Sequence, residues 1–64
     1  MYNIHTEMPS GAVSRGYEYE TEETAVESYT RVKSQLTDMG FVGTLIMTEG
    51  GIELQREAIP NAVG

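Results

Sequence analysis

The chain has 64 residues, with ten acidic side chains against four basic ones and a formal net charge of −6. It contains one His and no Cys, so neither disulfides nor thiolate zinc sites are available to it. A chain this short forms a single domain, and its scattered Lys and Arg residues disfavour direct binding to nucleic acid or to an anionic membrane.

The segments 2–8 and 13–19 both alternate between apolar and polar residues, which is typical of β-strands. A turn cluster, Pro-Ser-Gly, separates them. If the two strands pair across a four-residue loop, their apolar side chains fall on one face. This register predicts a first hairpin that pairs Met8 with Val13, Thr6 with Arg15, Ile4 with Tyr17 and Tyr2 with Tyr19. It also places Tyr2, Tyr17 and Tyr19 in the core.

Residues 22–39 have the pattern of one amphipathic helix. Thr21 is a suitable N-cap, and Glu22 and Glu23 follow in the first turn, where the helix dipole favours negative charge. Gly40 ends the helix in the left-handed conformation, after which Phe41 packs back against the last turn as in a Schellman motif. The predicted buried stripe consists of Ala25, Val26, Tyr29, Val32, Leu36 and Met39.

The segment 41–48 is apolar on both sides, and 52–57 alternates, with Gly50 and Gly51 providing a turn with positive φ. A second hairpin follows in one of two registers. The favoured one pairs Met47 with Ile52 and Leu45 with Leu54, and the alternative pairs Ile46 with Leu54. The chain from Pro60 onward is predicted to be a tail, because proline cannot continue a strand ladder.

The predicted fold is α+β, with element order ββαββ: an antiparallel sheet of up to four strands with one helix packed on one face, in a single domain spanning 1–64. In this arrangement Val42 and Ile46 lie on the side of the sheet away from the helix. Two interpretations stay open. They form an exposed strip that pairs with a partner or a second copy, or they are ordinary surface residues.

No residue pattern indicates catalysis. His5 is predicted to lie on the exposed side of the first strand, without the oriented carboxylate and nucleophile that a catalytic triad needs. The neighbouring glutamates are expected in solvent, and no metal-binding or phosphate-binding motif is present. Gly16 and Gly43 are expected to mark bulges or a close approach of the helix to the sheet. We therefore expect no enzyme activity, no cofactor and no metal site.

The N-terminus lacks the basic and then apolar pattern of a signal peptide, and no apolar run approaches the ~20 residues needed to cross a bilayer. Together with the absence of Cys, this predicts a cytoplasmic protein.

Half of the ten acidic residues fall within ten positions. Like charges at helix positions i and i+4, such as Glu23 and Glu27, cost a few tenths of a kcal/mol, and a cost that is tolerated there suggests a use. For the cluster alone, solubility is the first interpretation, followed by a basic protein partner and then by nucleic-acid mimicry. We expect a small non-enzymatic module that binds, and inhibits, a protein partner with a basic surface. Solubility alone, a structural homodimer, and a nucleic-acid mimic acting on a basic DNA-binding protein are the alternatives. The candidate partner-binding residues are Glu18, Glu20, Glu22, Glu23, Glu27, Val42 and Ile46.

Overall fold

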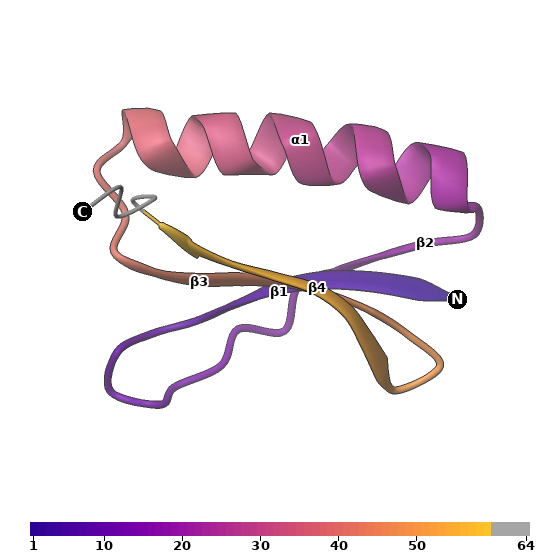
Figure 1. Cartoon of the computed structure of the whole chain (residues 1–64), viewed down its shortest axis with the longest axis horizontal. Coiled ribbons are helices and arrows are strands. Elements are labelled where there is room, and N and C mark those ends of the chain that lie inside the picture. Colours follow the sequence, from indigo (N-terminus) through magenta and orange to yellow (C-terminus); the bar gives the residue numbers. More distant parts are fainter. Residues whose placement is uncertain (60–64) are drawn as a thin grey trace.

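The computed structural model describes residues 1–59. Its elements are β1 (Tyr2–Glu7), β2 (Tyr17–Tyr19), α1 (Glu22–Asp38), β3 (Gly43–Glu49) and β4 (Ile52–Ile59). The strands form one antiparallel sheet in the order β2-β1-β3-β4, and α1 lies across one face of it (Figure 1). The predicted ββαββ order and α+β class are confirmed. The predicted tail from Pro60 lies outside the described residues.

The first hairpin follows the predicted register only at its open end. There the structure pairs Tyr2 with Tyr19 and Ile4 with Tyr17, as the alternation predicts. Nearer the turn, Glu7 forms an isolated bridge with Val13, so the ladder has shifted by one residue. The predicted pairs of Met8 with Val13 and of Thr6 with Arg15 are therefore wrong.

Gly16 causes that shift. Its φ of 76° is in the left-handed region, and a Cβ at this position would collide with the carbonyl oxygen of Ile4. The backbone therefore bulges here, and β2 has three residues instead of the seven predicted. Gly43, at the start of β3, is the second position where two backbone segments lie too close for a side chain. A Cβ there would be 2.6 Å from the carbonyl oxygen of Glu7.

The helix ends are set by the residues that the sequence indicates. Thr21 is the N-cap, and its side-chain oxygen accepts from the amide of Thr24 at 3.3 Å. At the other end, Gly40 has a φ of 76° and the Phe41 amide donates to the Leu36 carbonyl at 2.9 Å, which is the long hydrogen bond of a Schellman motif. The helix thus ends one residue earlier than predicted.

Both predicted registers of the second hairpin are wrong. The loop is Gly50 and Gly51, with φ values of 57° and 86°, so Glu49 pairs with Ile52. These angles suit a two-residue turn that only glycine adopts without strain at both positions, whereas the predicted loop required Glu49 to have a positive φ. A register shift next to Thr48 then brings Met47 opposite Gln55.

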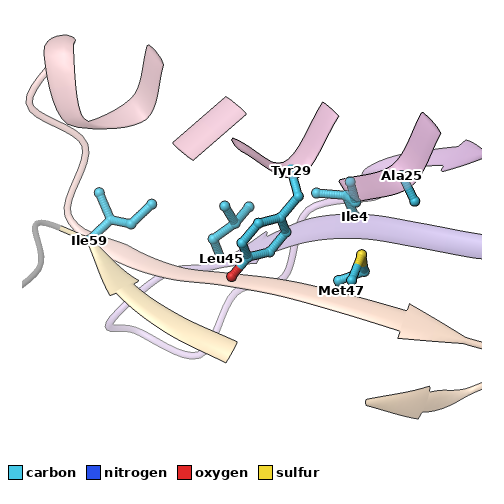
Figure 2. Close-up of a cluster of buried hydrophobic side chains, with 6 residues drawn as sticks. All are labelled: Ile4, Ala25, Tyr29, Leu45, Met47 and Ile59. Atoms are coloured by element: carbon cyan, nitrogen blue, oxygen red, sulfur yellow. The ribbon is translucent and has the colours of Figure 1, made fainter. Parts of the chain in front are cut away.

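The core lies between α1 and the sheet (Figure 2). Its centre is formed by six buried side chains: Ile4, Ala25, Tyr29, Leu45, Met47 and Ile59. Val32 and Leu36 pack against it and confirm most of the predicted helix stripe. Val26 and Met39 of the predicted stripe are exposed, and so is Tyr17 (72%), so their predicted place in the core is wrong. Val26 lies on the outward face of α1, and Met39 is the C-cap residue beyond its last turn.

The sheet face opposite α1 is open, and the β1–β2 connection and the β3–β4 turn both bend away from the helix on that side (Figure 1). Ile46 points to this face, yet it is only 4% exposed. Arg56 on β4 reaches over β3 to Glu7 on β1, with 3.3 Å between Nη1 and Oε1. Its aliphatic stem, together with the neighbouring His5, shields Ile46. The expected exposed strip is therefore wrong for Ile46.

Candidate interaction surfaces

The glutamates singled out in the sequence gather where β2 leads into α1. Glu18 lies in β2, Glu20 follows it, and Glu22 and Glu23 occupy the first turn of the helix. The N-terminal end of α1 and the start of β1 lie at the same end of the molecule (Figure 1). Glu27 continues the negative charge one turn along the helix, and all five carboxylate residues are exposed.

A sixth glutamate from a distant part of the sequence joins this end. Glu49, the last residue of β3, pairs with Tyr2, which in turn pairs with Tyr19 just before Glu20. Burial, followed by the charges of Glu49 and Glu22, raises the pKa of Tyr2. Only the sheet order places Glu49 here, and no sequence pattern indicated it. We call this set the acidic end: Glu18, Glu20, Glu22, Glu23, Glu27 and Glu49.

The charge of the acidic end is not compensated by ion pairs within residues 1–59. The ion pairs in that range join Lys33 to Glu57 and Arg56 to both Glu7 and Glu53. All of these acidic partners lie on β1 or β4, outside the acidic end. Two of the four basic side chains thus pair with acids outside the acidic end, and no ion pair within residues 1–59 neutralises the glutamates of the acidic end.

The outward face of α1 adds apolar area to the acidic end. Val26, Thr30 and Arg31 line a shallow groove there together with the helix glutamates Glu22, Glu23 and Glu27. All six residues come from one helix, so the groove is a surface between side chains and not an enclosed cavity. Such a surface suits contact with another macromolecule better than enclosure of a small molecule.

The other two candidate residues lie apart from the acidic end. Val42 is 59% exposed and lies just before β3, beyond the C-terminal end of α1, while Ile46 is buried on the open face. A 17-residue helix spans ~25 Å, so Val42 and the acidic end are at opposite ends of the molecule. The structure does not bring all the candidate residues into one surface.

A polar contact ties the helix to the edge strand. Lys33 on α1 forms an ion pair with Glu57 on β4, and the Gln55 side-chain amide donates to the same carboxylate at 2.8 Å. Hydrogen bonding to Lys33 is the main cause that lowers the Glu57 pKa. Tyr29 is buried beside this pair, and its hydroxyl has no hydrogen-bond partner within the described part of the chain. Burial and the Glu57 charge raise the Tyr29 pKa.

His5 is half-buried on the open face, where its Nδ1 lies 2.7 Å from Oδ1 of Asn3. Across residues 1–59, no three His, Asp or Glu side chains are grouped closely enough to hold a metal ion. The same range contains no helix with the length and apolar character needed to span a membrane.

Comparisons with protein-family models, with curated proteins and with solved structures found no match for the chain. The functional argument therefore depends on the geometry and charge of the chain itself.

Proposed function

We propose that the chain is a non-enzymatic protein-interaction module whose acidic end binds the basic surface of a partner protein. The observation that supports this most directly is the convergence of six glutamates, one of them distant in sequence, without ion pairs inside residues 1–59. Uncompensated charge of one sign raises the rate of association with a surface of the opposite sign. A partner whose basic surface is a nucleic-acid-binding groove would make the chain a mimic of that ligand.

The test compares two variants of equal net charge. Glu23→Gln removes one charge from the acidic end, and Asp38→Asn removes one charge outside it, at a residue that forms no ion pair within residues 1–59. The wild-type chain is used to capture partners from its native host, and the affinity of each partner is then measured for all three proteins at two salt concentrations.

The acidic-end variant should bind the partner about two- to fivefold more weakly, since an exposed charge pair contributes ~0.2–1 kcal/mol. The control variant should bind like the wild type, and higher salt should weaken wild-type binding. Equal affinities for both variants, or no partner at low or at physiological salt, would refute the proposal.

A further inference from the structure

A pocket of about 560 Å³ opens at the edge of the sheet, beneath the C-terminal half of α1. The bulge at Gly16 delays the start of β2 to Tyr17, so β2 does not extend under this part of the helix. Val32 and Leu36 from α1 form one wall, and Ile4 and Leu45 from the sheet form the floor. The size is within the ~300–1,000 Å³ range of small-molecule sites, which are mostly apolar with a few placed polar groups.

The pocket is also lined by polar residues, His5, Thr6, Ser14, Arg15 and Tyr17, and two of them, Arg15 and Ser14, suit an anion. Arg15 is exposed there, and within residues 1–59 it forms no ion pair, although the chain has more than twice as many acidic as basic residues. A free guanidinium beside an apolar cavity matches a carboxylate, which it binds through two parallel hydrogen bonds.

Ser14 adds a second donor in the same pocket. Its hydroxyl oxygen accepts from the Thr6 amide at 2.9 Å and from the Thr6 hydroxyl at 3.0 Å. Because a hydroxyl has two acceptor positions and one proton, Ser14 keeps its proton for donation. Arg15 and Ser14 thus both line this pocket and both have hydrogen-bond donors to offer a ligand.

We propose that this pocket binds a small amphipathic carboxylate, an acid of about eight carbons whose tail lies among Ile4, Val32, Leu36 and Leu45 and whose carboxylate lies on Arg15 and Ser14. The proposal uses no residue of the acidic end, so it stands or fails separately from the proposed partner binding. Physiological ionic strength limits the repulsion from distant glutamates, because the Debye length there is ~8 Å.

The test is a titration of the ¹³C-methyl-labelled chain with octanoate, followed by NMR. The comparison ligands are 1-octanol and octylammonium, which share the tail but lack the negative charge. Octanoate should shift the methyl signals of the four tail-binding residues and should bind more tightly than either comparison ligand. Arg15→Gln should weaken octanoate binding about tenfold and leave 1-octanol binding unchanged.

Arg31→Gln is the matched control, because Arg31 is also an exposed arginine but lines the outward face of α1. It should bind octanoate like the wild type. Arg15 is exposed, so its replacement leaves the core intact. The proposal is overturned if octanoate shifts none of these methyl signals, if 1-octanol binds as tightly as octanoate, or if both arginine variants lose affinity equally.

Discussion

Tyr29 shows how a single side chain combines a stabilising contribution with a cost. Its ring fills the middle of the core between α1 and the sheet, and the residue is only 4% exposed (Figure 2). Its hydroxyl, however, is buried without a hydrogen-bond partner inside the described range. An unsatisfied buried polar group costs ~1–3 kcal/mol, so the ring stabilises the fold while the hydroxyl opposes it.

Replacing Tyr29 by Phe should therefore raise the free energy of unfolding by about 1 kcal/mol, measured by urea denaturation at pH 7. The raised Tyr29 pKa adds a pH effect. The folded state holds this proton more strongly than the unfolded state, so the part of the stability that depends on Tyr29 protonation is fully present below pH 10 and declines above it. The Tyr29→Phe variant should lack the part of the loss of stability above pH 10 that comes from the Tyr29 hydroxyl.

Tyr17→Phe is the control, since Tyr17 is mostly exposed and its hydroxyl should contribute within ~0.5 kcal/mol. A loss of stability in Tyr29→Phe would show that the hydroxyl donates to Glu57 and would contradict the assignment of an unsatisfied group.

At the scale of the elements, β4 is an edge strand with a polar link to the helix. It pairs only with β3, and most of its residues are exposed. The Lys33–Glu57 pair is its polar link to α1, while Ile59 anchors its end in the core. The side chains of the pair are 38% and 25% exposed, so solvent screening limits its contribution to about 0.5 kcal/mol.

A double-mutant cycle with Lys33→Gln and Glu57→Gln should give a coupling energy of about 0.5 kcal/mol at pH 7. Because Lys33 lowers the Glu57 pKa below the ordinary value of 4.5, this contribution is present above pH 4.5. It is lost as the pH falls through the folded-state pKa. Unfolding measured between pH 3 and 7 checks this, and a coupling energy that does not change across the range would contradict it.

At the scale of the whole molecule, the two faces of the sheet are closed in different ways. The helix covers one face with apolar contacts, and polar side chains that reach across the strands cover Ile46 on the other. A domain of this size has a free energy of unfolding of only ~3–10 kcal/mol. Losing the contacts that cover either face of the sheet would therefore remove a large share of that free energy.

Ile46→Lys should unfold the monomer, because a lysine in a site that is only 4% exposed is costly without a partner charge. Val42→Lys, in the same segment but 59% exposed, should change stability by less than ~0.5 kcal/mol. Circular dichroism measures folding and light scattering measures mass. A folded Ile46→Lys variant with a lower mass than the wild type would instead support a homodimer through this face.

The sequence by itself determined the elements and their order. Thr21 and Gly40 set the helix ends, the double glycine set a turn, and alternation indicated the strands, because capping, turn geometry and side-chain period act between residues close in the chain. Five glutamates of the acidic end were also evident in the sequence.

Only the tertiary structure decided the registers, the sixth glutamate and the pocket. The β1–β3 pairing brings Glu49 beside Tyr2, and the bulge at Gly16 leaves the space beneath Val32 and Leu36. Burial of Ile46 likewise depends on an arginine that reaches across a neighbouring strand. These features arise from contacts between residues far apart in the chain, and a local pattern contains no information about which strands become neighbours. The slip at Gly16 is the exception, since an isolated glycine in a strand pattern indicates a bulge.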